Sequence, residues 1–112
     1  TYVDTALPDQ PTRVQDGPIT FGGLVDRVYD TILTPKIIDP SIGRAISVES
    51  ENSGTTIVWN PGPEGATNLA DLAKSEWKRF VCVETGNARD NSVTLLPRHS
   101  HAIEATYRVE RV

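Results

Sequence analysis

Polar and hydrophobic residues alternate with a period of two along much of the chain. From Arg44 to Glu51 the side chains divide cleanly into two alternating sets, and the same period returns from Ala102 to Val109. Successive side chains of a strand point to opposite faces of a sheet, so both stretches predict half-exposed antiparallel strands. Asn52-Ser53-Gly54 favours a tight turn. We therefore expect a hairpin, with the returning strand over Thr55–Trp59.

Short apolar runs between turn-forming residues predict further strands. These lie at residues 1–5, 19–21, 24–29, 34–40 and 92–96, with a loop over 6–18. One helix is expected over Thr67–Lys74, where Leu69, Leu72 and Ala73 recur at helical spacing. Many short strands and a single short helix predict an all-β fold, an antiparallel sandwich or barrel.

The segment Phe80–Val83 is apolar and is followed by the turn-forming Gly86-Asn87. This pattern predicts a strand that is covered on both faces. Alternation places Glu84 on the same face as Phe80 and Cys82, where the strand emerges from the interior. Partial desolvation there would suit the Glu84 carboxylate to act as a general base. The alternative is a glutamate that simply reaches solvent at the end of a strand.

Asp26 falls on an apolar-flanked face of its expected strand, between Leu24 and Val28. An unpaired carboxylate is costly in such a place. Two interpretations remain open from the residues alone. Asp26 either forms a salt bridge or a turn cap, or it makes a functional contact.

Composition excludes several classes of protein. The chain has 112 residues, enough for at most one domain, and its net charge of -4 with a pI near 5.0 argues against a nucleic-acid binder. No apolar run approaches the roughly 20 residues that span a bilayer, so no membrane association is expected. The single cysteine, Cys82, fits a reducing compartment, and we expect a cytoplasmic protein.

Metal and cofactor signatures are weak. His99 and His101 are two residues apart, but no cysteine or carboxylate is spaced to complete a metal site. Gly22-Gly23 matches neither phosphate-loop spacing. Cys82 lies inside an apolar run, where cysteine usually behaves as a small hydrophobic residue rather than a nucleophile. We therefore expect no metal and no cofactor.

Four short motifs occur together in one order. They are Val-Asp-Arg-Val-Tyr at 25–29, Val-Trp-Asn-Pro at 58–61, Val-Cys-Val-Glu-Thr-Gly-Asn-Ala at 81–88 and Leu-Leu-Pro-Arg-His-Ser-His at 95–101. This set resembles the carboxyl-terminal part of the hexose-6-phosphate mutarotases, or glucose-6-phosphate 1-epimerases, of the aldose 1-epimerase (galactose mutarotase-like) superfamily. The resemblance covers nearly the whole chain.

The resemblance implies a large antiparallel β-sandwich with a sugar site on a concave sheet face, of which residues 1–112 form the carboxyl-terminal part. It also implies a cofactor-free exchange of the α and β anomers of a hexose 6-phosphate. A glutamate takes the proton from the anomeric hydroxyl and a histidine protonates the ring oxygen. Glu84 matches the catalytic base, and Asp26 matches a contact to a substrate hydroxyl. Arg27, His99 and His101 are expected to be structural.

Members of that family are considerably longer, and the catalytic histidine and the phosphate-binding residues belong to their other half. The chain contains no methionine, and we take it as a fragment. We expect it to be inactive alone and to pair with the missing amino-terminal segment or with itself. Two rivals remain: a non-catalytic carbohydrate-binding or regulatory module of the same fold, and a purely structural sandwich.

Overall fold

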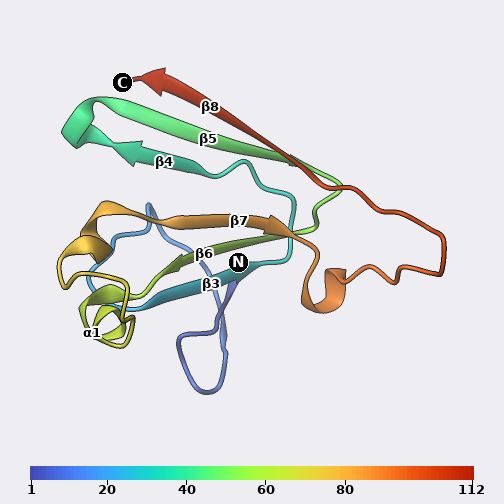
Figure 1. The fold of residues 1–112 in the computed structure, drawn as a ribbon, viewed down its shortest axis with the longest axis horizontal. Coiled ribbons are helices and arrows are strands. Elements are labelled where there is room, and N and C mark those ends of the chain that lie inside the picture. Colours follow the sequence, from blue (N-terminus) through green and yellow to red (C-terminus); the bar gives the residue numbers. More distant parts are fainter. The chain divides into compact units, whose positions relative to one another are not determined.

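The computed structural model describes all 112 residues and consists mainly of strands in two sheets (Figure 1). The five-stranded sheet has the order β2-β1-β3-β6-β7, and the three-stranded sheet has the order β4-β5-β8. The strands are β1 (Tyr2–Asp4), β2 (Thr12–Arg13), β3 (Val25–Tyr29), β4 (Lys36–Asp39), β5 (Arg44–Glu51), β6 (Thr55–Asn60), β7 (Cys82–Gly86) and β8 (Glu104–Arg111). β1 pairs antiparallel with β2 and β3, and β5 pairs antiparallel with β4 and β8. The predicted all-β class, an antiparallel β-sandwich of the mutarotase type, is confirmed.

Helical structure is confined to short segments: α1 (Gly62–Thr67) and the 3-10 turns Pro40–Ile42, Glu76–Arg79 and Arg89–Asn91. The chain divides into two compact units. The first comprises Thr1–Tyr29 and Ile57–Glu84, and the second comprises Asp30–Thr56 and Thr85–Val112. None of the helical segments has the length and hydrophobicity of a membrane-spanning helix.

The first unit is built around aromatic and branched side chains of β1, β3 and β6. Tyr2, Val25, Val28, Tyr29 and Val58 are all buried. The rings of Tyr2 and Tyr29 lie 5.6 Å apart between centroids. The Tyr29 hydroxyl donates to the side chain of Gln15, and burial raises the pKa of Tyr29. The ring contact joins β1 to β3, the strand that carries Asp26.

The turn after β6 departs from the sequence prediction, because α1 begins at Gly62 and the predicted helix over Thr67–Lys74 is wrong. Prolines at residues 61 and 63 favour the first turn of a helix, since their φ is already helical. Gly62 has a φ of +66°, and a Cβ there would lie 2.4 Å from the backbone carbon of Gly23. A glycine is therefore required at this close approach.

The second unit contains the three-stranded sheet, in which β5 is the central strand. Its predicted bounds are confirmed, and the predicted β8 begins two residues late, at Glu104. The register aligns Ile37, Ile46 and Val109 across the three strands, which gives one face an apolar row. The opposite face carries the ion pairs Lys36–Glu110 and Arg108–Glu49.

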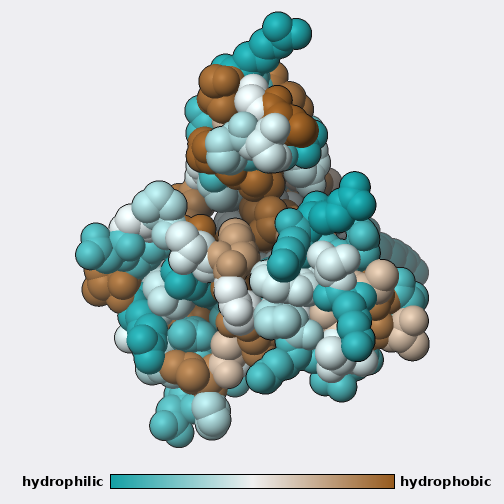
Figure 2. All heavy atoms as spheres, turned by 90° about the vertical axis from the view of Figure 1, so that its left-hand side faces the viewer, coloured by the Kyte–Doolittle hydropathy of each residue, from teal (hydrophilic) through white to brown (hydrophobic).

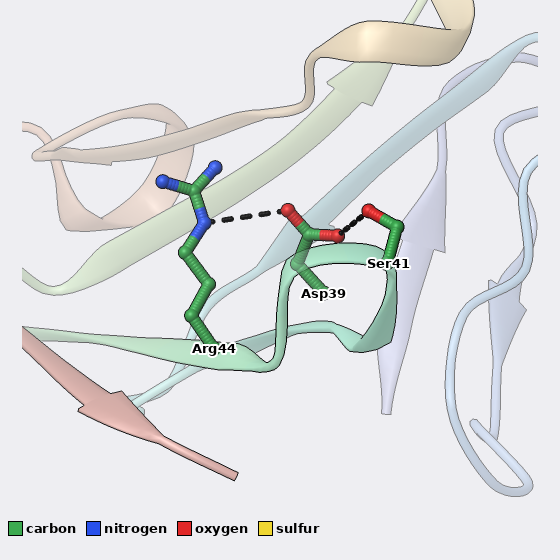
Figure 3. Close-up of polar contacts among 3 residues, drawn as sticks. All are labelled: Asp39, Ser41 and Arg44. Carbon is green, nitrogen blue, oxygen red and sulfur yellow. Dashed lines mark hydrogen bonds and ion pairs between the residues drawn. The ribbon is translucent and has the colours of Figure 1, made fainter.

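The connection between β4 and β5 is closed by polar contacts (Figure 3). The Ser41 hydroxyl donates to Asp39 Oδ1 at 2.5 Å, and Arg44 Nε donates to Asp39 Oδ2 at 3.3 Å. The Ser41 hydrogen bond, together with the Arg44 charge, holds the pKa of Asp39 below its ordinary value. Gly43, with a φ of +63°, completes the turn.

Four further predictions are wrong. β5 and β6 do not form a hairpin, because β6 joins the five-stranded sheet and β5 pairs with β4 and β8. Residues 19–21 and 92–96 form no strand, whereas the expected loop over 6–18 contains β2. Apolar residues make a strand only where a neighbouring strand pairs with their backbone, and neither run pairs with a strand.

Apolar side chains are frequent at the surface. Figure 2 shows brown, hydrophobic residues exposed among hydrophilic ones. Tyr107 and Val109 of β8 alternate with charged residues as predicted, yet their side chains are 63% and 66% exposed. The alternation therefore identified the strand and its faces, but not the extent of burial in this chain.

Candidate active site

Glu84 and Asp26 both lie in the five-stranded sheet. Glu84 is the third residue of β7, and Asp26 is the second residue of β3. β6 is hydrogen-bonded between these two strands, as the strand order shows. Neighbouring strands are about 4.8 Å apart, so the backbones of β3 and β7 are separated by roughly 10 Å where they run level. The structure thus puts both residues on one sheet, with a single strand between them.

Glu84 is exposed, and β7 is an edge strand of the sheet in this chain. The prediction of a strand covered on both faces is wrong here: Cys82 and Val83 are only half-buried, and Phe80 is 36% exposed. The desolvation expected at Glu84 is therefore absent from this chain. Its carboxylate makes no hydrogen bond or ion pair with another residue.

Cys82 and Glu84 are two residues apart in β7, so their side chains share one face of the strand. Burial raises the pKa of the Cys82 thiol, and the nearby negative charge of Glu84 raises it further. A raised pKa keeps the thiol protonated and weakly nucleophilic. Cys82 is therefore a poor candidate for nucleophilic catalysis.

Asp26 is half-buried, and only its backbone is bonded within the chain. Its carbonyl oxygen accepts hydrogen bonds from the Thr5 hydroxyl at 3.1 Å and from the Thr5 N–H at 3.0 Å. The side chain forms neither the salt bridge nor the cap that was one of its two interpretations. The carboxylate of Asp26 thus makes no hydrogen bond or ion pair within the chain.

Arg27, next to Asp26, has a contact of its own on the other face of the strand. Its register partner on β1 is Asp4, and its guanidinium carbon lies 4.3 Å from the centroid of the Tyr2 ring. Arginine over an aromatic face is a stabilising contact. This arrangement is a packing role, as the sequence led us to expect.

The start of β7 is held by Asn60, which is 1% exposed. Asn60 Nδ2 donates to the carbonyl of Trp77 at 2.8 Å and to the carbonyl of Phe80 at 2.9 Å. Asn60 Oδ1 accepts from the N–H of Gly62 at 2.9 Å. One buried amide therefore ties the segment that leads into β7 to the turn that ends β6.

The end of β7 is held by hydroxyl groups. The buried Ser53 Oγ accepts from the Gly86 N–H at 2.8 Å and donates to the Gly86 carbonyl at 2.9 Å. Thr55 Oγ1 is bonded in the same way to the N–H and the carbonyl of Ala88, at 3.3 and 3.2 Å. These side chains satisfy backbone groups that would otherwise require another strand.

A cluster of side-chain amides continues this network beyond the strand. Asn87 Nδ2 donates to the Asn52 carbonyl at 2.9 Å, and its Oδ1 accepts from the Gly54 N–H at 2.9 Å. His101 Nε2 lies 3.1 Å from Asn87 Nδ2 and 3.2 Å from the Asn52 carbonyl oxygen. His101 thus has the structural role expected for it. His99 is exposed, and no three His, Cys, Asp or Glu residues are grouped to hold a metal ion.

No pattern in the sequence singled out Asn60, Ser53 or Asn87 as supports of this strand. A usable signal existed for Asn60, because an asparagine before Pro-Gly favours a turn that its side chain caps. The other two depend on partners 33 residues or more away along the chain.

Comparison with known proteins decides the family. The aldose 1-epimerase family model matches residues 3–108. The chain belongs to the aldose 1-epimerase family. This confirms the resemblance that the four motifs indicated.

Three curated members of the family carry the name "Putative glucose-6-phosphate 1-epimerase". The protein from Escherichia coli is 29% identical over 108 residues, which cover 93% of this chain and 36% of that protein. The one from Salmonella typhimurium is 38% identical over 75% of this chain and 29% of its own length. The one from Cenchrus ciliaris is 30% identical over 86% of this chain and 29% of its own length. No solved structure matches the chain. The chain spans about a third of the length of these relatives.

Proposed function

We propose that residues 1–112 form the carboxyl-terminal part of a single mutarotase domain that exchanges the α and β anomers of a hexose 6-phosphate. Glu84 is the general base in this proposal, and Asp26 binds a substrate hydroxyl. The relatives named as glucose-6-phosphate 1-epimerases support this substrate class. The family match to residues 3–108 supports the sugar chemistry.

The observation that carries the proposal is the pair of carboxylates without internal partners on one sheet. Carboxylates in folded proteins are commonly paired or hydrogen-bonded when they lie on a partly apolar face. The half-buried Asp26 has no such partner, and the exposed Glu84 lies on the same sheet, with only β6 between the two strands. An acceptor-only carboxylate can take the hydrogen bond of a sugar hydroxyl, and at Glu84 it can take the proton itself.

The reaction divides between this chain and the rest of the domain. Glu84 removes the proton from the anomeric hydroxyl while an acid protonates the ring oxygen; the carbon–oxygen ring bond breaks, the aldehyde carbon rotates, and closure reverses both proton transfers. Glu84 lies in this chain, whereas the acid and the groups that hold the phosphate belong to the remainder of the domain. We propose that this chain pairs with that remainder, and that it has no enzyme-like activity alone.

The deciding experiment is Glu84→Gln in the intact protein that contains this chain. Glutamine keeps the size of the side chain but cannot accept the proton, so anomer exchange should fall about 10² to 10⁴-fold. The rate is measured by NMR saturation transfer between the two anomers of glucose 6-phosphate. The purified 112-residue chain, assayed in the same way, should match the rate in buffer.

The matched control is Glu104→Gln on β8, an exposed glutamate with no ion pair. Its rate should stay within about twofold of the wild type, since changes at such surface sites are small. If the Glu84→Gln protein retains most of its exchange rate and still binds glucose 6-phosphate, Glu84 is not the base. Glu84 would then be a sugar-binding group, and the sugar-binding module would be the better interpretation.

A further inference from the structure

Asn60 makes more hydrogen bonds than its position in a turn requires. Capping the turn needs only its Oδ1, which accepts from the Gly62 N–H. Both hydrogens of its Nδ2 are used elsewhere, on the carbonyls of Trp77 and Phe80 at 2.8 and 2.9 Å. With 1% of its surface exposed, Asn60 has no water to replace these partners. Both the amide nitrogen and the amide oxygen of the Asn60 side chain are thus bonded to the backbone.

The two carbonyls bound by Asn60 lie on the segment that enters β7. Phe80 is two residues before the first residue of β7 and four residues before Glu84. The ring of Phe80 also lies 6.2 Å from the ring of Trp59, the neighbour of Asn60 on β6. An amide bond network and a ring contact therefore fix the same point of the chain to the end of β6.

This attachment matters because β7 is an edge strand with β6 as its one neighbour. Side chains of a strand alternate between faces, so a slip of one residue would move Glu84 to the opposite face of the sheet. Strands with few backbone partners are weakly held in register. The Asn60 side chain can accept only one alignment, since its two donors must reach both carbonyls at once.

From this geometry we propose that Asn60 is a positioning residue for Glu84. It sets the register in which β7 leaves Phe80, and so determines the face on which the Glu84 carboxylate lies. Asn60 acts through the backbone and does not touch the substrate. The inference rests on the proposed role of Glu84 as the base.

The test uses the intact protein and three variants: Asn60→Ala, Glu84→Gln and the double variant. A base misplaced by about 1 Å can lose on the order of 10²-fold in rate. Asn60→Ala should therefore lower kcat for anomer exchange about 10- to 100-fold, with KM for glucose 6-phosphate changed less than about threefold. In the Glu84→Gln background the same substitution should have no further effect on kcat, because there is no base left to misplace.

Asn91→Ala is the matched control. Asn91 Nδ2 also donates to a backbone carbonyl, that of Gly54 at 2.8 Å, with longer contacts of 3.4 Å to the Asp30 carbonyl and Thr55 Oγ1, but it makes no hydrogen bond to the segment from Trp77 to Gly86. At a temperature well below the unfolding midpoints of both variants, Asn91→Ala should change kcat less than about twofold. Equal losses of kcat in the Asn60 and Asn91 variants would overturn the proposal and leave Asn60 a purely structural residue.

Cys82 gives a second readout that does not depend on activity. It is the single cysteine of the chain, is half-buried, and shares the face of Glu84. Native-state labelling of Cys82 by a disulfide reagent should change at least severalfold in Asn60→Ala and stay close to wild type in Asn91→Ala. If Asn60→Ala does not fold, Asn60→Ser carries both measurements, with smaller changes in the same direction because the hydroxyl can donate to only one carbonyl. Wild-type labelling in a folded Asn60 variant would contradict the proposed register shift.

The two proposals fail in different ways. If the Glu84→Gln protein keeps its exchange rate, the proposed role of Glu84 as the base is wrong, whatever the effect of the Asn60 substitution on the labelling of Cys82. If kcat falls strongly in Glu84→Gln but stays near the wild-type value in the Asn60 variant, Glu84 remains the proposed base and Asn60 is not its positioning residue.

Discussion

β5 and β7 are both short alternating strands, but they are held in the fold by different means. Every residue of β5, from Arg44 to Glu51, has a register partner on β8, and Arg44 to Ser47 also pair with β4. β7 lies at an edge, and side chains of Asn60 and Ser53 bond to the backbone at its two ends. β5 is thus held by backbone pairing on both sides, whereas β7 pairs with β6 alone and is held at its ends by a few particular side chains.

The difference bears on where the chemistry is proposed. A ladder of backbone bonds tolerates many side chains, because every residue offers the same N–H and carbonyl groups. Buried side-chain to backbone bonds tolerate very few, since removal of one partner leaves the other unsatisfied. The proposed base lies on β7, whose ends are held by buried side-chain to backbone bonds. Its placement is therefore sensitive to single substitutions that would have small effects elsewhere.

The largest effect on stability is expected on β5, where Val48 is 1% exposed. Val48→Ala removes two buried methyl groups and should lower the free energy of unfolding by about 2–3 kcal/mol. Val83→Ala on the half-buried β7 should cost roughly half as much. Urea denaturation of the three proteins measures both changes. Equal costs would show that β7 is as well packed as β5.

Removal of a hydroxyl group should destabilise the protein more at the end of β7 than on β5. Ser53→Ala leaves the N–H and carbonyl of Gly86 without their partner, and we expect a loss of about 2 kcal/mol. Ser47→Ala, on β5, removes a hydroxyl that has no such bond and should stay within about 0.5 kcal/mol of the wild type. Thermal unfolding followed by circular dichroism compares the pair. A Ser47 variant that is destabilised as much as the Ser53 variant would contradict the distinction between the two strands.

The smallest effect concerns pH at the turn that feeds β5. The Ser41 hydroxyl bond, with the Arg44 charge, lowers the pKa of Asp39 from its ordinary value of 3.8. A lowered pKa in the folded state stabilises the protein above pH 3.8, and this contribution is lost as the pH falls through the folded value. Asp39→Asn should therefore have a lower unfolding midpoint than the wild type at pH 7, with the gap closing in acid. Asp9→Asn is the control, since Asp9 is exposed and makes no hydrogen bond or ion pair with another residue, and its unfolding midpoint at pH 7 should stay close to that of the wild type.

Local patterns predicted much of the strand content and little of the pairing. β5 was predicted with its observed bounds, and β1, β3 and β4 lie inside their predicted stretches, because alternation and proline or glycine boundaries are properties of neighbouring residues. The hairpin after β5 was wrong because a turn sequence says that the chain reverses, not which strand lies beside it. The runs at 19–21 and 92–96 failed for the same reason.

The candidate site shows the same division. The alternation of β7 placed Glu84 and Cys82 on one face, and the effect of the Glu84 charge on the thiol agrees with it. The expected burial of Glu84 was wrong, because the cover on a strand comes from elements elsewhere in the chain. The supports of β7 were invisible for a similar reason: Ser53 and Gly86 are 33 residues apart, and no local pattern connects them.

By itself the sequence determined the class of the fold, the faces of its main strands and the family, since these depend on the local order of residues and on short motifs within the chain. Only the tertiary structure decided that β6 leaves β5 for another sheet, that β7 is an edge, and that Asn60 and Ser53 secure its two ends. The physical reason is that side-chain alternation is a property of the local backbone. Hydrogen-bond partners and burial are supplied by residues distant in sequence, which come together only when the chain folds.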